Sequence, residues 1–318
     1  MTPHCSRPWM TMFSANVALV AMITASPVMS DSLKQRIITA VILLLCLIAA
    51  TTLFPPFWFA LFIAALVLVA SWEWVALIGL TDSKSRQAYL ATMILMLIGA
   101  LLLLGLEPGT ERIDLIRALM VLSLGLVWWS IAWLMLFGYP DNARQWNDKS
   151  KIGLMGLLAL IPTWVGIVVL KYLLPSGFLV LGLVIMVAAV DVGAYFVGRA
   201  FGSRPLAPSL SPKKTWEGVW GGLATCCAVG ALFVWGMHSY LFELNTWQTI
   251  VLLLSSLVIT VFAVVGDLVE SMLKRNSNLK DSGHILPGHG GILDRVDAIL
   301  AVTPASVIIL LLTLQGGS

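Results

Sequence analysis

Apolar runs of about 20 residues recur along almost the whole chain, and they constrain its fold more than any other feature. Each run is long enough to cross the ~30 Å hydrocarbon core of a membrane as a helix. Lipid offers the backbone no hydrogen-bond partners, so such segments must be helical, and the short alternating segments of a β-barrel are absent from the sequence. The chain is therefore predicted to be an all-α, polytopic integral membrane protein.

Composition excludes a water-soluble globule. Hydrophobic residues make up 59% of the 318 residues and charged residues only 11%, whereas a soluble domain carries about 25% charged residues. We predict nine spans, near residues 36–54, 57–80, 88–106, 115–138, 152–174, 177–200, 216–238, 247–266 and 296–314.

The distribution of Lys and Arg predicts the orientation. Alternate connections between the spans hold fifteen of these residues, against three on the opposite side. Basic connections stay in the cytoplasm, so the first span begins on the cytoplasmic side and the C-terminus lies on the far side. We expect a multi-pass protein of the inner (plasma) membrane with its active site on the cytoplasmic face.

Residues 1–28 are treated separately from a single transmembrane domain at 29–318. Their weak apolar stretch is compatible with a poor signal sequence or an extra span. The favoured interpretation is a misplaced start with Met29 as the true first residue, because the residues after it form a complete beginning for this topology.

Two predicted cytoplasmic connections hold most of the polar residues. The first, residues 198–218, includes the run SPKKTWEG with Lys213 and Lys214. The second, residues 266–297, supplies Lys274, Arg275 and Lys280, cations suited to phosphate oxygens. It also has glycines around His289, which permit positive φ and close approach of backbone N–H groups to an anion.

Three aspartates in the second connection predict a metal site. Asp267 lies on one helical face with Lys274, and Asp294 and Asp297 stand three apart at the start of the last span. Carboxylates hold a hard cation that bridges substrate phosphates, so we expect one or two Mg²⁺ ions, with a second kind of cation possible. The alternative for Asp294 is a helix cap.

The segment from Ser271 to Asp297 resembles the signature of the phosphatidate cytidylyltransferase family, also called CDP-diacylglycerol synthases. The match covers the fixed positions of that pattern, which are Ser271, Leu273, Lys274, Arg275, Lys280, Asp281, Gly283, Leu286, Pro287, His289, Gly290, Gly291, Asp294, Arg295 and Asp297. SPKKTWEG, the stretch DVGAYFVGR from Asp191 and the tetrad SWEW from Ser71 are similar to the same family.

The resemblance implies transfer of a cytidylyl group from CTP to phosphatidic acid with magnesium, for phospholipid biosynthesis. It implies catalytic roles for a set of polar residues, namely Lys274, Arg275, Lys280, Asp281, His289 and Arg295. Substrate-binding roles are expected for Lys213, Lys214, Gly290 and Gly291, with the two lysines on the leaving pyrophosphate or on the lipid phosphate. Homodimerisation fits the family, although no heptad or small-residue motif supports it, and nucleic acid is not an expected partner.

Several alternatives remain open at this point. His289 either binds phosphate or packs the glycine loop. Asp191 either lines the polar cavity or makes a hydrogen bond between helices. For Glu73, flanked by two tryptophans, we expect a structural partner such as an arginine. The rival functions are a CTP-dependent polyprenol or phytol kinase, a related CTP:lipid transferase such as a synthase acting on an ether lipid, a transporter or proton channel that uses acids within the membrane, and an inactive scaffold.

Overall fold

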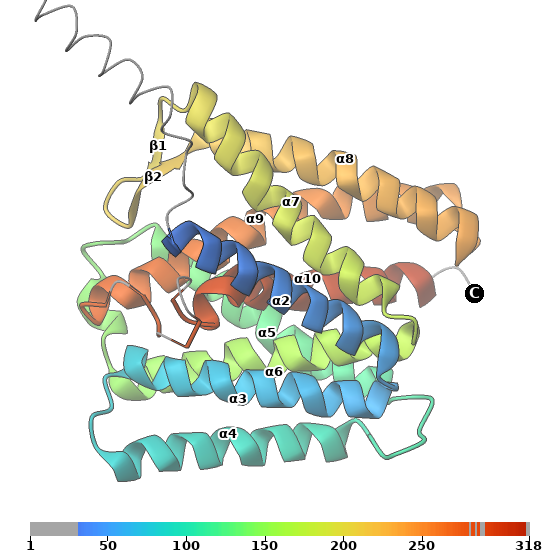
Figure 1. Cartoon of the computed structure of the whole chain (residues 1–318), viewed down its shortest axis with the longest axis horizontal. Helices are drawn as coiled ribbons and strands as arrows, with labels where there is room; N and C mark the ends of the chain where they lie inside the picture. Colours follow the sequence, from blue (N-terminus) through green and yellow to red (C-terminus); the bar gives the residue numbers. More distant parts are fainter. Residues whose placement is uncertain (1–30, 280, 284, 287–289, 316–318) are drawn as a thin grey trace, which may run out of the picture.

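The protein, seen in a computed structural model, is a bundle of α-helices with one short β-hairpin at its edge (Figure 1). The structure describes residues 31–279, 281–283, 285–286 and 290–315. The α-helices are α2 (Asp31–Leu53), α3 (Pro56–Ile78), α4 (Ser83–Leu103), α5 (Leu115–Leu136), α6 (Lys149–Leu173), α7 (Phe178–Phe201), α8 (Trp216–Tyr240), α9 (Thr246–Asn276) and α10 (Leu293–Gln315).

Eight of the described helices, α3 to α10, are long and apolar enough to cross a membrane. Helix α2 adds a shorter apolar stretch, Ile38–Leu53. The prediction of a polytopic helical protein is thus confirmed. The main difference lies at the polar connection, where α9 continues to Asn276, well past the predicted end at residue 266. Leu268, Val269, Met272 and Leu273 are buried, so the apolar face of α9 continues after its sequence has become polar.

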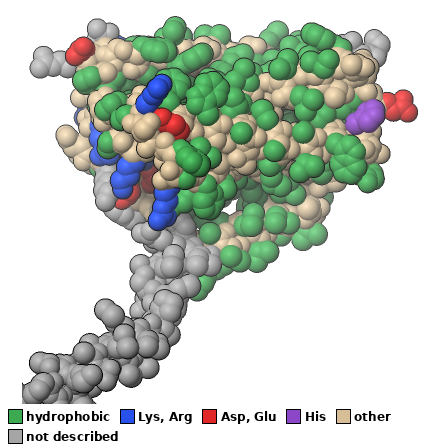
Figure 2. Space-filling view, turned by 90° about the horizontal axis from the view of Figure 1, so that it is seen from above, with side chains coloured by type: hydrophobic (Ala, Val, Ile, Leu, Met, Phe, Trp, Pro, Cys, Tyr) green, Lys and Arg blue, Asp and Glu red, His purple; other side chains and the backbone are tan. Residues whose placement is uncertain are grey.

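Apolar side chains cover the face of the bundle shown in Figure 2, while the basic side chains visible there gather at one end. Leu95 and Leu134 are among the many large apolar residues that are exposed. An exposed apolar surface of this extent marks contact with lipid. The centre of the bundle is filled by residues such as Trp164, whose indole N–H donates to the Ala60 carbonyl at 2.9 Å and joins α6 to α3.

Successive helices reverse direction, so the basic connections come together at one end of the bundle, which we call the charged end (Figure 1). It comprises the last turns of α3, α5, α7 and α9 and the first turns of α4, α6, α8 and α10. Glycines allow α7 and α8 to pack closely beside it: a Cβ at Gly193 would lie 2.6 Å from the Gly221 carbonyl oxygen.

The hairpin departs from the all-α prediction. Strands β1 (Pro205–Ala207) and β2 (Ser211–Thr215) pair antiparallel in the connection between α7 and α8. The Leu210 N–H donates to the Ala207 carbonyl at 3.1 Å and closes the turn. Thr215 then caps α8, because its hydroxyl accepts the Gly218 N–H at 3.2 Å. The basic residues of β2 therefore have a fixed backbone next to the helix ends.

Candidate active site

A polar cavity of about 470 Å³ opens at the charged end between α7, α8, α9 and the hairpin. We call it the polar pocket. Its charged lining residues are Asp191, Arg199, Lys213, Lys214 and Asp267. The expectation that Asp191 lines a polar cavity is confirmed by this arrangement. The rest of the lining is mostly apolar and includes Val190, Leu206 and Val264. A cavity with both kinds of wall suits a molecule that has a charged part and an apolar part.

The two lysines of β2 have different surroundings. Lys214 forms an ion pair with Asp267 of α9, and these side chains are 26% and 36% exposed. Lys213, the neighbouring residue on β2, is exposed to solvent at the rim of the polar pocket. Both lysines line the polar pocket, but only Lys214 has a carboxylate partner there among the described ion pairs.

A second cluster of charges lies between α9 and α10. The Lys274 ammonium group donates to Glu270 Oε2 at 2.9 Å and to Asp294 Oδ1 at 2.8 Å. All three side chains are largely removed from solvent, with exposures of 15%, 6% and 9%. Within the described residues, Glu270 Oε1 is buried without a hydrogen-bond partner. A buried carboxylate oxygen in that state is suited to a cation or a donor that is supplied from outside.

Asp294 also organises the turn that precedes α10. This turn contains Gly290 and Gly291, and we call it the glycine loop. Its Oδ2 atom accepts the Gly291 N–H at 2.9 Å and the Ser282 N–H at 3.1 Å. Gly290 has φ of +82°, so the prediction of positive φ in this loop is confirmed there. Asp294 therefore holds this turn and also contacts Lys274. The N–H groups that it accepts belong to residues before α10, so these bonds do not make it a cap of that helix.

Helices α9 and α10 approach closely at Gly266. A Cβ at that position would lie 2.5 Å from the Asp297 carbonyl oxygen. The contact brings the adjacent residue Asp267 close enough for its charge, and that of Lys214, to act on Asp297. The three aspartates predicted to bind metal are thus distributed over one short stretch of the α9–α10 interface.

The donor chemistry of this stretch fits a hard divalent cation, because Asp267, Glu270, Asp294 and Asp297 all offer carboxylate oxygens. No three acidic, histidine or cysteine side chains of the described residues converge into a ready-made metal site. Lysines occupy two of the carboxylates instead, Lys214 on Asp267 and Lys274 on Asp294. Metal binding would therefore require these carboxylates to exchange an ammonium partner for the cation.

The remaining predicted residues are less closely grouped. Arg275, Asp281 and Arg295 are exposed at the charged end. Gly290 lies beside Asp281, since a Cβ added to it would be 3.6 Å from the Asp281 Cβ. Lys280 and His289 lie outside the described residues. The catalytic and binding roles of all these side chains stay predictions.

Two acidic residues were missed or misread from the sequence. Glu270 was not singled out, although it lies three residues after Asp267 and four before Lys274, on the same helical face. Glu73 was expected to pair with an arginine, and this was wrong. Its carboxylate accepts the N–H groups of Ile292 and Leu293, at 3.0 and 2.8 Å. The sequence could not show this contact because 219 and 220 residues separate the partners.

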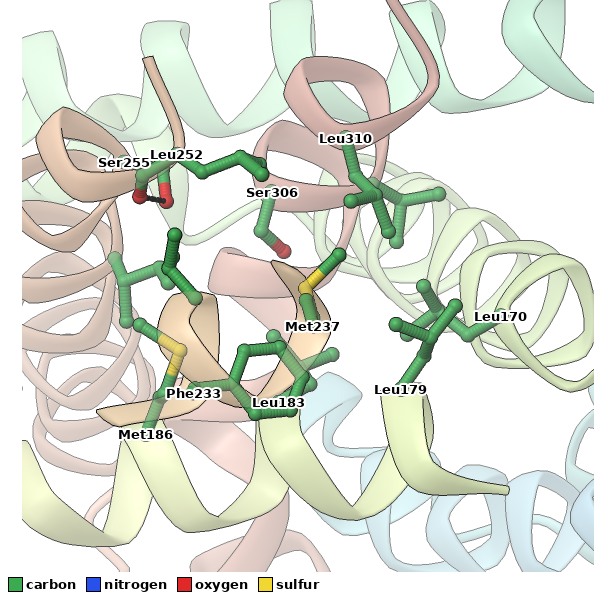
Figure 3. Close-up of a pocket in the computed structure, with 13 residues that line it drawn as sticks. Leu170, Leu179, Leu183, Met186, Phe233, Met237, Leu252, Ser255, Ser306 and Leu310 are labelled. Atoms are coloured by element: carbon green, nitrogen blue, oxygen red, sulfur yellow. Dashed lines mark hydrogen bonds between the residues drawn. The ribbon is translucent and has the colours of Figure 1, made fainter. Parts of the chain in front are cut away.

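A smaller cavity lies farther from the charged end, between α7, α8, α9 and two further helices, α6 and α10. Figure 3 shows the side chains that line it. We call it the apolar pocket. Its volume is about 50 Å³, and leucine, methionine and phenylalanine side chains such as Leu183, Met186 and Phe233 line it, with Ser255 and Ser306 as the polar exceptions. It holds no charged group and offers no chemistry for a phosphate.

Comparison with known proteins assigns a family to this architecture. The model of the cytidylyltransferase family matches residues 34–313. A phosphatidate cytidylyltransferase of Pseudomonas aeruginosa is 41% identical over 272 residues, which cover 86% of this chain and 94% of the relative. One from Haemophilus influenzae is 36% identical over 285 residues, covering 86% and 96%. One from Bacillus subtilis is 47% identical over a shorter region, 120 residues, covering 38% and 42%.

Proposed function

The chain belongs to the cytidylyltransferase family, and from this we propose that it transfers a cytidylyl group from CTP to phosphatidic acid. The products are CDP-diacylglycerol and pyrophosphate. It is a membrane-embedded, CTP-dependent nucleotidyltransferase that serves phospholipid synthesis.

The observation that carries this proposal is the polar pocket at the membrane-spanning bundle's charged end. Lys213, Lys214 and Arg199 supply cations for phosphate groups, and the apolar walls are open to the acyl part of a lipid. A nucleotide enters such a site from water, while the lipid enters from the side of the bundle. The same site can therefore hold one water-soluble and one membrane substrate.

The chemical step needs positioning and charge neutralisation more than a strong base. A phosphomonoester is largely ionised near neutral pH. An oxygen of the phosphatidate phosphate attacks the α-phosphorus of CTP, and the bond from that phosphorus to the pyrophosphate oxygen breaks. Lys214 and Lys274 neutralise the phosphate charges during this exchange. Arg275, Lys280 and Arg295 are further cations for the two substrates, and Gly290 and Gly291 give the backbone close access to the nucleotide.

We further propose that Asp267, Asp294 and Asp297, with Glu270, hold one or two Mg²⁺ ions. A bound Mg²⁺ would withdraw charge from the nucleotide phosphates and make the α-phosphorus more electrophilic. The orphan oxygen of Glu270 supports the proposal. Once phosphates occupy the polar pocket, Lys214, which lines it, has an alternative anionic partner, and Asp267 becomes free for the cation.

We place the charged end at the cytoplasmic face of the inner membrane. The excess of Lys and Arg in the connections at this end supports that orientation. CTP is a cytoplasmic metabolite, which requires the same orientation. The check uses two variants that each carry a single cysteine, Lys213→Cys at the charged end and Thr110→Cys at the opposite end. In intact cells, a membrane-impermeant thiol reagent should label the cysteine at 110 and not the cysteine at 213.

The decisive test of function is product analysis with purified protein in detergent. CTP and Mg²⁺ are supplied with phosphatidic acid, with diacylglycerol or with a polyprenol. We expect pyrophosphate and CDP-diacylglycerol with phosphatidic acid, and no turnover with the two alcohols. Release of CDP with either alcohol would identify a kinase and contradict the proposal.

A further inference from the structure

Glu73 is a buried carboxylate far from the signature segment in sequence, yet it contacts that segment directly. It lies five residues before the end of α3 and is 2% exposed. Its Oε1 accepts the Ile292 N–H at 3.0 Å and its Oε2 accepts the Leu293 N–H at 2.8 Å. Ser282 contributes a longer hydrogen bond from its hydroxyl to Oε2, at 3.5 Å.

These partners explain how a negative charge is tolerated in the interior. The first N–H groups of a helix have no partner within the helix, and they carry the positive end of its dipole. Leu293 is the first residue of α10, so Glu73 caps this helix from outside it. A carboxylate accepting charge-assisted hydrogen bonds from such groups is held firmly in place.

The loop is built to admit this carboxylate. A Cβ at Gly283 would lie 2.5 Å from Glu73 Oε1, and a Cβ at Gly291 would lie 2.5 Å from Oε2. Two glycine backbones therefore enclose the carboxylate from two sides, and any side chain at either position would displace it. Gly291, predicted from the sequence to bind the nucleotide, and Gly283 thus provide space for Glu73.

Glu73 and Asp294 hold the same turn from opposite sides. Ser282 donates its N–H to Asp294 and its hydroxyl to Glu73. Gly291 donates its N–H to Asp294, and the next two N–H groups donate to Glu73. Release of the turn from Glu73 would thus release the backbone that orients Asp294, and through Asp294 the ammonium group of Lys274.

From this geometry we infer that Glu73 is a positioning residue, which fixes the glycine loop and the start of α10 so that Asp294 is presented to the metal and nucleotide. The inference rests on the proposed cytidylyl transfer for its catalytic consequence. Loss of a group that orients a metal ligand reduces metal affinity by about 10- to 100-fold.

The test compares Glu73→Gln with Trp164→Phe. Trp164 is fully buried, and its indole N–H donates to the Ala60 carbonyl of α3 at 2.9 Å, away from the proposed metal ligands. Each substitution disturbs a buried hydrogen bond of α3. For each variant the apparent melting temperature, kcat and the Mg²⁺ concentration that gives half-maximal activity are measured in detergent.

We expect Glu73→Gln to raise the half-activating Mg²⁺ concentration about tenfold or more, and Trp164→Phe to leave it unchanged while lowering the melting temperature. Glu73→Asp keeps the charge on a side chain one methylene shorter and should give an intermediate value. If Glu73→Gln keeps the wild-type Mg²⁺ dependence and loses only stability, as Trp164→Phe does, Glu73 is merely structural and the inference is overturned.

A measurement without substrates separates this inference from the proposed function. Hydrogen exchange followed by mass spectrometry, in metal-free buffer, should show faster exchange at residues 282–293 in Glu73→Gln than in Trp164→Phe. Equal exchange in the two variants would overturn the inference even if the enzyme were active. Ser282→Ala, which removes one donor to Glu73 and keeps the N–H to Asp294, serves if Glu73→Gln does not fold, and faster exchange is again expected.

Discussion

Helices α7, α8 and α9 contribute to two pockets of opposite chemistry, one completed by the hairpin and the other by α6 and α10. The polar pocket at the charged end is about 470 Å³ and includes five charged side chains. The apolar pocket is about 50 Å³ and is lined by hydrocarbon with two serines (Figure 3). Along α7 and α9 they are separated by a single turn, from Met186 to Val190 and from Ile259 to Ala263.

The difference shows what polar groups within a membrane bundle require. Close packing fills the apolar end almost completely, since nothing there offsets the loss of contacts in a void. At the charged end, the lysines and carboxylates keep a cavity open because each needs partners or water. We therefore expect substitutions at the charged end to change catalysis and those at the other end to change stability.

The largest expected effect is that of Asp294→Asn. Asp294 joins Lys274, the glycine loop and the proposed metal, so kcat should fall about 10²-fold or more. Pyrophosphate release measures it. The matched control is Asp114→Asn at the opposite end. Like Asp294, Asp114 accepts a backbone N–H, that of Arg117 at 3.0 Å, and there it caps α5. A comparable loss in both variants would contradict the proposed division between the two ends.

The next effect distinguishes the neighbouring lysines of β2. Lys214→Met removes the partner of Asp267 and a phosphate contact, so we expect kcat/KM for CTP to fall about 10- to 100-fold. Lys213→Met removes an exposed charge at the rim and should cost less, because solvent already screens it. Steady-state kinetics at fixed Mg²⁺ gives both values. Equal losses would mean that both lysines contact the nucleotide.

The division of the bundle into a charged end and an apolar remainder could largely be predicted from the sequence, because hydrophobic runs and basic connections are visible along the chain. The helices and the gathering of basic ends follow from segment length and alternation alone. Asp267 and Lys274 were placed correctly on one face of a continuing α9, since helical spacing relates residues within a helix.

Contacts between helices could not be predicted in the same way. The partner of Glu73 lies more than 200 residues away, and no spacing rule connects the two. The pairing of Lys214 with Asp267 depends on the hairpin, which a basic, proline-containing segment did not suggest. Helical spacing alone places Glu270 on the same face as Asp267 and Lys274, so this residue could have been predicted from the sequence.

At the end opposite the site, Lys171 provides a test of stability without catalysis. It is fully buried, and its ammonium group donates to the Thr51 and Pro175 carbonyls, each at 2.5 Å. Lys171→Met keeps the chain length and leaves both carbonyls without this donor, at a cost of about 1–3 kcal/mol each. The apparent melting temperature in detergent should fall by several degrees, with kcat per folded molecule unchanged. Lys84→Met, at an exposed lysine, is the control and should change neither.

The smallest effect is expected from Leu183→Phe, which fills the apolar pocket without adding polarity. Overpacking in a closed interior costs about 1–3 kcal/mol, and the existing void offsets part of that cost, so the melting temperature should change little and kcat should stay within about twofold of wild type. Activity is measured with phosphatidic acids of short and long acyl chains. Equal activities for both would leave the apolar pocket as a packing feature. A selective loss with long chains would mean that the substrate's acyl chain reaches past the turn between the pockets, and that the two cavities act as one site.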